Sequence, residues 1–218
     1  MKKLILIAAA ITSLTSCYTT TQVPNSSYSY KMLNEKKEVV DTGSTVSYTD
    51  SLVNAVFSIG NENVSFVLRN KTENTMKILW DECLFIKNGV SEKVMHEGIK
   101  YTDKNQSMPP SVIPAGLVHT DIIIPTNNVY WRQGYYSQYG SLPGGWETKP
   151  LFPESTGEGT TFSVFMPMVI NNQQKEYTFN FEVGKKTTTY KEEKVPNATG
   201  TFMLTFVICL LPLMFLLQ

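Results

Sequence analysis

The chain has 218 residues and carries 19 basic and 19 acidic side chains. Charged residues make up 17% of the chain and aromatic residues 11%, which is typical of a globular domain and argues against a disordered protein. The lack of a basic excess argues against a dedicated nucleic-acid-binding protein, which needs clustered lysine and arginine to contact phosphates. We therefore expect one domain with tails and no nucleic-acid partner.

The first residues have the pattern of an export signal. Lys2 and Lys3 precede an apolar run that is too short to span a bilayer. The run leads into Leu14-Thr15-Ser16-Cys17, which resembles the lipobox of bacterial lipoproteins. The resemblance implies that residues 1–16 are a cleaved signal peptide and that Cys17 is acylated. An ordinary signal peptide with a chance cysteine is the alternative.

Two polar stretches flank the expected domain. Residues 17–45 are rich in Thr, Ser, Asn, Tyr and Lys and show little sustained apolar pattern, so we expect a flexible tether, with a short strand possible around Glu38–Asp41. Residues 184–200 are similarly polar and are expected to form a second linker. The domain itself is expected to cover residues 46–183.

Within 46–183, short apolar runs alternate with turn residues, which predicts strands rather than helices. Asn88-Gly89 predicts a tight hairpin, residues 171–174 predict another turn, and Pro167 indicates a bulge or an edge strand. Close spacing of strands and turns predicts an antiparallel β-sandwich. The expected strands are Val53–Ile59, Val64–Arg69, Met76–Trp80, Cys83–Ile86, Ser91–Met95, Leu117–Ile124, Thr161–Ile170 and Glu176–Val183.

Three short segments resemble the immunoglobulin-like domains of bacterial envelope lipoproteins. They are Phe-Val-Leu-Arg-Asn-Lys-Thr at 66–72, Val-Ile-Pro-Ala-Gly at 112–116 and Tyr-Thr-Phe-Asn-Phe at 177–181. The resemblance implies an immunoglobulin-like sandwich. Because these motifs serve folding, it implies no catalytic residues.

Residues 201–217 are almost entirely apolar. A helix of this length would rise about 26 Å, close to the roughly 30 Å hydrocarbon core of a bilayer, and Pro212 would kink it. We expect a membrane-embedded segment; a hydrophobic helix packed on the sandwich or on a partner is the alternative. Tyr18 follows the lipidated position where the resembled family often has the inner-membrane retention signal Asp. The resemblance thus favours the outer membrane, facing the periplasm, over the inner membrane, whereas an apolar helix favours the inner membrane.

No catalytic or metal-binding motif stands out. Asp103 to Ser107 match the start of a calcium loop, but Met108 and Pro114 stand where that loop needs Gly and Glu. His96 and His119 are far apart in sequence and lack the spacing of a zinc site, so each is expected to be a surface or core histidine. Cys83 is expected to be a buried thiol. We expect no cofactor, no metal and no catalytic residues.

One segment, Val129–Phe152, is unusually rich in both aromatic residues and glycine. Such rings either recognise a ligand from a loop or fold back to cap one end of the sandwich. We expect Trp131, which follows Val129 and Tyr130, to be buried, and Trp146, which follows two glycines, to be exposed. The candidate binding residues are Tyr130, Trp131, Tyr135, Tyr136, Tyr139 and Trp146.

The sequence therefore predicts a membrane-anchored envelope lipoprotein that acts as a non-catalytic binding or adaptor module. Its expected partners are membrane lipid, through Cys17 and residues 201–217, and an unidentified protein or glycan. The alternative is a structural component of a membrane protein assembly that uses residues 201–217 to pack against other helices. An enzyme of unidentified class is a third possibility.

Overall fold

The computed structural model describes residues 18–137, 140–153 and 155–196. The chain divides into two compact units: a sandwich unit, Tyr28–Lys186, and a terminal unit, Met1–Ser27 with Thr187–Gln218. The predicted signal peptide, Cys17, Tyr139 and segment 201–217 lie outside the described residues. Among the residues described, no helix is long and apolar enough to cross a membrane.

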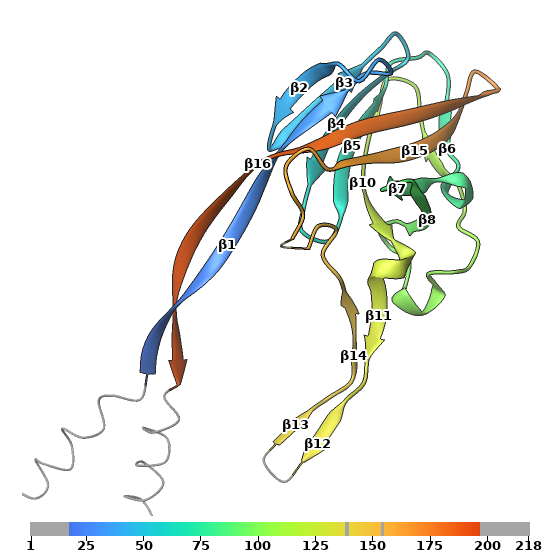
Figure 1. The fold of residues 1–218 in the computed structure, drawn as a ribbon. Helices are drawn as coiled ribbons and strands as arrows, with labels where there is room; N and C mark the ends of the chain where they lie inside the picture. Colours follow the sequence, from blue (N-terminus) through green and yellow to red (C-terminus); the bar gives the residue numbers. More distant parts are fainter. Residues whose placement is uncertain (1–17, 138–139, 154, 197–218) are drawn as a thin grey trace, which may run out of the picture. The chain divides into compact units, whose positions relative to one another are not determined.

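One sheet of the sandwich unit contains four antiparallel strands, and it positions half of the core (Figure 1). The strands lie in the order β3 (Thr45–Thr49), β4 (Val53–Ile59), β5 (Val64–Asn70) and β10 (Val118–Pro125). Alternate residues of β4 and β5 are buried, as expected for strands that have one face on the core. The predicted β4 is confirmed to the residue, and β5 is one residue longer than predicted.

The second sheet is built around β15 (Thr161–Ile170). On one side β15 pairs with β16 (Gln173–Pro196), followed by β1 (Tyr18–Leu33) and β2 (Val39–Gly43). On the other side it pairs with β7 (Leu84–Lys87) and β6 (Met76–Ile78), which pair in turn with β8 (Val90–Met95) and β9 (Ser111–Ile113). Short 3-10 helices η2 (Trp80–Glu82), η3 (Tyr101–Asp103) and η4 (Thr126–Asn128) interrupt the strand pattern. A short ladder between β8 and β10 joins the two sheets.

Aromatic side chains from both sheets meet in the core. The ring centroid of Phe57 in β4 lies 4.7 Å from that of Phe179 and 5.2 Å from that of Phe181, both in β16. The ring of Phe162 stacks on Phe181 at 4.9 Å. Burial of one such ring stabilises the fold by roughly 1.5–3 kcal/mol relative to exposure. The predicted architecture, antiparallel sheets in a sandwich-like arrangement, is confirmed.

The two predicted hairpin turns are also confirmed. Asn88 and Gly89 have φ angles of 52° and 76° and connect β7 directly to β8, with Lys87 opposite Val90. Asn171 and Asn172, at 53° and 60°, connect β15 to β16 in the same way. A two-residue turn of this kind needs positive φ at both positions, and Asn and Gly tolerate it best.

The interpretation of Pro167 as a bulge or edge marker is wrong. β15 lies inside the sheet, and Pro167 pairs with Glu176 of β16 without a shift in register. On the opposite side, β7 pairs with β15 as far as Phe165, and β6 begins pairing at Met168. Pro167 falls in this gap, where its carbonyl accepts the backbone N–H of Leu79 at 3.0 Å. The missing N–H of proline therefore costs the ladder nothing.

Strands occupy much of the region where the sequence predicts a flexible tether. β1 and β2 pair with each other, and Tyr30 and Met32 of β1 are buried in the core. The ring of Tyr30 packs on Phe152 and Phe162 at 6.1 and 6.2 Å. The sandwich unit thus begins 18 residues before the predicted boundary at residue 46. The expected linker 184–200 likewise contains the last part of β16, which continues to Pro196.

Candidate functional site

The aromatic segment forms a two-part β-hairpin, here called the arm, which comprises residues 129–148. β11 (Val129–Arg132) pairs with β14 (Gly145–Thr148), and β12 (Tyr135–Ser137) pairs with β13 (Gly140–Leu142). Each pair is a two-stranded sheet separate from the sandwich sheets. Figure 1 shows the arm extending away from the body of the sandwich unit. The backbone of the arm therefore does not fold back over the end of the core.

The described rings of the arm are exposed to different degrees. Tyr135 and Tyr136 near the tip are 65% and 77% exposed, and Trp131 and Trp146 are 55% and 36% exposed. The expectation that Trp131 is buried is wrong. Its neighbour Val129 is buried, but the chain leaves the core directly after it. The sequence pattern therefore located the end of the core one or two residues too late.

The two tryptophans face each other across the base of the arm. Trp131 and Trp146 are directly opposite in the ladder, with their ring centroids 5.6 Å apart and edge to face. Trp146 also contacts Tyr101 of the sandwich, at 6.4 Å between centroids. This second contact explains why Trp146 is the less exposed of the pair. Edge-to-face aromatic pairs contribute about 0.5–1.5 kcal/mol beyond the area they bury.

Two glycines permit the close approach of the arm's strands. A Cβ on Gly134 would lie 2.7 Å from the backbone nitrogen of Gly144, and a Cβ on Gly144 would lie 2.9 Å from Cζ2 of Trp131. Neither distance accommodates a side chain without a shift of the neighbouring backbone or ring. These glycines are therefore needed to hold Trp131 against the strand opposite.

A polar cluster forms around Tyr130 and Glu147, the cross-strand pair next to Trp131 and Trp146. The Tyr130 hydroxyl donates to Glu147 Oε2 at 2.8 Å, and Arg132 Nε forms an ion pair with Glu147 Oε1. The hydrogen bonds from Arg132 and Tyr130 hold the pKa of Glu147 below its usual value, and the bond to Glu147 raises the pKa of Tyr130. Residues 133–146, between the two charged partners, contain no charged side chain. The arm thus presents neutral aromatic surface beyond a charge-balanced base.

Sequence reasoning missed a second cluster, in the sandwich. His96 Nδ1 and His119 Nε2 both contact Asp121 Oδ2, at 3.1 and 3.2 Å. The other carboxylate oxygen accepts the backbone N–H groups of Glu97 and Ile122 at 2.9 and 2.7 Å. Burial acts to raise the pKa of Asp121, but the hydrogen bonds from His96 and the two backbone groups outweigh it and lower this pKa.

His96 and His119 are 23 positions apart in sequence, yet both contact Asp121, and each is a largely buried, hydrogen-bonded histidine. His119 and Asp121 alternate on one face of β10, and this spacing was the available signal. His96 stacks flat on Trp80 with ring centroids 4.2 Å apart. Within the described part of the chain, no group of three or more His, Cys, Asp or Glu residues has the geometry of a metal site. The cluster is best described as a satisfied buried carboxylate that ties the segment directly after β8 to β10.

Cys83 is buried, as predicted, and its thiol lies 3.4 Å from the carbonyl of Leu79. Burial, with a smaller effect of the Glu82 charge, raises the pKa of Cys83 to about 12. The residue is therefore a thiol at neutral pH rather than a nucleophilic thiolate.

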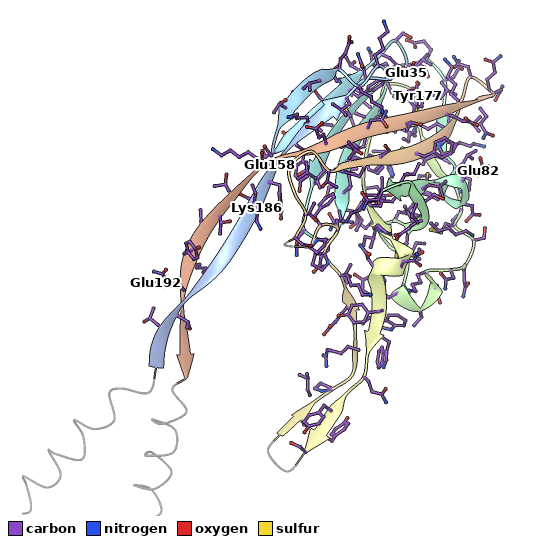
Figure 2. The ribbon with its side chains drawn as sticks, viewed as in Figure 1. Glu35, Glu82, Glu158, Tyr177, Lys186 and Glu192 are labelled. Atoms are coloured by element: carbon purple, nitrogen blue, oxygen red, sulfur yellow. The ribbon has the colours of Figure 1, made fainter. Side chains whose placement is uncertain are left out.

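A crevice of about 540 Å³ lies between the β1–β2 turn, β3 and the start of β16. Among the residues that line it, Asp50 accepts hydrogen bonds through Oδ2 from the hydroxyl groups of Tyr177 at 3.0 Å and Tyr48 at 3.4 Å. Burial and the bond to Asp50 raise the pKa of Tyr177. Figure 2 labels Tyr177 and Glu35 at this end of the sandwich unit. Because Asp50 Oδ1 also accepts two backbone N–H groups, its carboxylate is already fully engaged in holding the fold.

Comparisons with protein-family models, with curated proteins and with solved structures find no match.

Proposed function

We propose that this protein is a membrane-anchored envelope lipoprotein that acts as a non-catalytic binding or adaptor module, with the arm as its recognition element. The observation that carries the proposal is the exposure of Trp131, Tyr135, Tyr136 and Leu142 on a hairpin that extends from the sandwich. A set of large apolar side chains exposed together on one hairpin is typical of an interaction site.

The arm is suited to binding by ring burial. Tyr and Trp offer large contact areas with few rotatable bonds, so little side-chain entropy is lost when they are covered. The cross-strand Trp131–Trp146 pair orders part of this surface before any partner arrives. Because residues 133–146 are uncharged, covering them requires no desolvation of charge.

We favour a protein partner over a glycan. The β12–β13 ladder has only two strands, so each strand keeps an outer edge that can pair with a strand of another chain. The Tyr135–Leu142 and Tyr136–Ser141 pairs would flank such an edge. A glycan would use the rings alone and leave the strand edges unused.

The anchor and the cellular location follow from the sequence. The lipobox resemblance supports acylation of Cys17, and the apolar run 201–217 supports a further membrane contact. Tyr18 at the position after Cys17 favours the outer membrane, facing the periplasm. The three motifs at 66–72, 112–116 and 177–181 support an immunoglobulin-like form of the sandwich.

A photo-crosslinking experiment in intact cells tests the proposal. A benzophenone amino acid placed at Tyr136 should give a discrete protein adduct, whose yield falls at least fivefold when Tyr135→Ala and Trp131→Ala are added. The same probe at Val90, an exposed position on the β7–β8 hairpin, is the matched control and should give no such adduct. Equal adducts from both positions, or none from Tyr136, would refute recognition by the arm.

The run 201–217 favours a second candidate, a structural subunit of a membrane assembly. In that case a partner would stay bound in detergent, and binding would be lost on removal of residues 201–217 but not on substitution of Tyr136.

A further inference from the structure

The N-terminal and C-terminal strands form a two-stranded ribbon in the terminal unit. β1 and β16 are neighbours in the sheet, and the terminal unit contains their outer parts, 18–27 and 187–196 (Figure 1). The Ser27 hydroxyl donates to the carbonyl of Thr187 at 3.5 Å. Two residues further along β1, the Ser29 hydroxyl accepts the backbone N–H of Lys185 at 2.9 Å. Because residue numbers rise along one strand as they fall along the other, the strands are antiparallel.

This register determines which ends of the strands meet. Stepping outward from Ser27 and Thr187, an unbroken antiparallel ladder places Gln22 opposite Glu192 and Tyr18 opposite Pro196, to within a residue. Tyr18 is the first residue of β1 and Pro196 is the last residue of β16. Figure 1 shows both of these strand ends at the same end of the ribbon.

The predicted lipidation site, Cys17, and the apolar run 201–217 lie close in sequence to those strand ends. Cys17 directly precedes Tyr18, and four residues separate Pro196 from the apolar run that begins at Thr201. Strands in a ladder are about 4.8 Å apart, and an extended chain advances at most about 3.6 Å per residue. Thr201 is therefore confined to within roughly 27 Å of Cys17. This reach is shorter than the roughly 30 Å hydrocarbon core of a single bilayer.

We infer that the acyl chains on Cys17 and the apolar segment 201–217 enter the same bilayer from the same side, as a two-point anchor at the outer end of the β-ribbon. The inference rests on the proposed lipidation of Cys17. It excludes an arrangement in which the lipid lies in one membrane and the apolar segment in another. It also replaces the flexible tether with a paired ribbon that leads both chain segments to one place.

The composition of the ribbon suggests that the two anchors stabilise the pairing of its strands. The described side chains of its outer part, such as Thr20, Gln22 and Tyr190, are exposed, so these side chains form no core. An isolated two-stranded ribbon is marginally stable in water. Holding both strand ends in one membrane keeps them at high effective concentration, which favours pairing. Loss of either anchor should therefore fray the ribbon from its membrane end.

Cysteine cross-linking in the full-length, membrane-bound protein tests the ribbon. With Gln22→Cys and Glu192→Cys, a short bismaleimide should join the two strands. The matched control pair, Gln22→Cys with Thr187→Cys, is offset by five residues, or about 17 Å along the strand. We expect at least tenfold more product from the first pair, and a severalfold loss of that product when the chain ends after Gly200. Equal yields from the two pairs, or a yield unaffected by the truncation, would overturn the inference.

A vesicle experiment tests the single bilayer directly. The purified lipidated protein, reconstituted into phosphatidylethanolamine–phosphatidylglycerol vesicles, should not tether a second population of empty vesicles. Clustering that depends on residues 201–217 would overturn the inference. Fatty-acid labelling of the native protein separates the two proposals: absent labelling would refute lipidation at Cys17, whereas the cross-linking result would still report on the ribbon.

Discussion

Replacement of Asp121 by Asn should destabilise the sandwich strongly, although it removes only a charge. The Asp121 carboxylate is 4% exposed and accepts four hydrogen bonds, two from imidazoles and two from backbone N–H groups. Because both imidazole nitrogens donate, neutral His96 carries its proton on Nδ1 and leaves Nε2 as an acceptor. His96 Nε2 is buried and has no hydrogen-bond partner among the described residues.

The side-chain amide introduced by Asp121→Asn cannot reproduce this arrangement. If its oxygen keeps the two backbone N–H groups, its NH₂ group faces two imidazole donors, and His96 must move its proton to the buried Nε2. Two charge-assisted hydrogen bonds, each about 1.5–3 kcal/mol, become neutral bonds of about 0.5–1.5 kcal/mol, and one buried donor is left unpaired at a further cost of about 1–3 kcal/mol. We expect a net loss of about 3 kcal/mol, which corresponds to a fall in Tm of roughly 6–12 °C for a chain of this size.

The assay is thermal and urea unfolding of the chain from Tyr18 to Pro196, with Glu97→Gln as the control. Glu97 is exposed beside the same histidine, so its substitution should change stability by less than about 0.5 kcal/mol. The pKa of Asp121 is lowered in the folded state, so its contribution is complete above the unfolded value of about 3.9 and is lost as the pH falls through the folded pKa. The difference between wild type and Asp121→Asn should therefore be present at neutral pH and shrink as the pH falls below about pH 4. A variant as stable as wild type at neutral pH, or a difference that persists unchanged in strong acid, would refute this reasoning.

Further outcomes follow from the same structure. Trp146→Ala should cost about 1 kcal/mol more than Trp131→Ala in the same unfolding assay, because Trp146 is the more buried ring; the reverse order would contradict the structure of the arm. The fragment 46–183 should melt well below the fragment 18–196, because it lacks β1 and its three buried side chains, Tyr30, Met32 and Leu33; matching melting curves would show that β1 adds nothing to the core. Cys17→Ser should remain unprocessed and unlabelled by fatty acid, and normal processing of that variant would disprove the lipobox interpretation.

The strands that could be predicted are those whose pattern is local. In β4 and β15, buried side chains alternate over seven and ten residues, with a break at Pro167 in β15, and turn residues bound each run. β1 also alternates, through Tyr28, Tyr30 and Met32, but over a shorter span and among polar residues. Its burial depends on contacts with Phe152 and Phe162, more than 100 residues away. The short alternating pattern of β1 therefore does not identify it as a buried strand, because the residues that bury it lie far along the chain.

The candidate site shows the same limit in a different form. The sequence shows that the arm is rich in aromatic residues. Whether these residues are exposed depends on where the chain leaves the core, which is directly after the buried Val129. The His96–Asp121 contact joins the residue that follows β8 to a residue of β10 and has no sequence spacing of its own. Residue types could therefore be listed in advance, whereas their groupings required the register of β8, β10, β11 and β14.

The glycines give the strongest argument for regarding the arm as a recognition element. Rings that merely cap a core pack against it, and flexible glycines would then serve only to turn the chain. Here Gly134 and Gly144 lie where the two sides of the arm approach each other most closely, and Gly144 lies against the ring of Trp131. The glycines thus order an aromatic surface away from the core, and a fold that needed only to cover its core would gain nothing from that arrangement. Ordering exposed rings in advance lowers the entropy lost on binding, which is the property expected of a surface that recognises a partner.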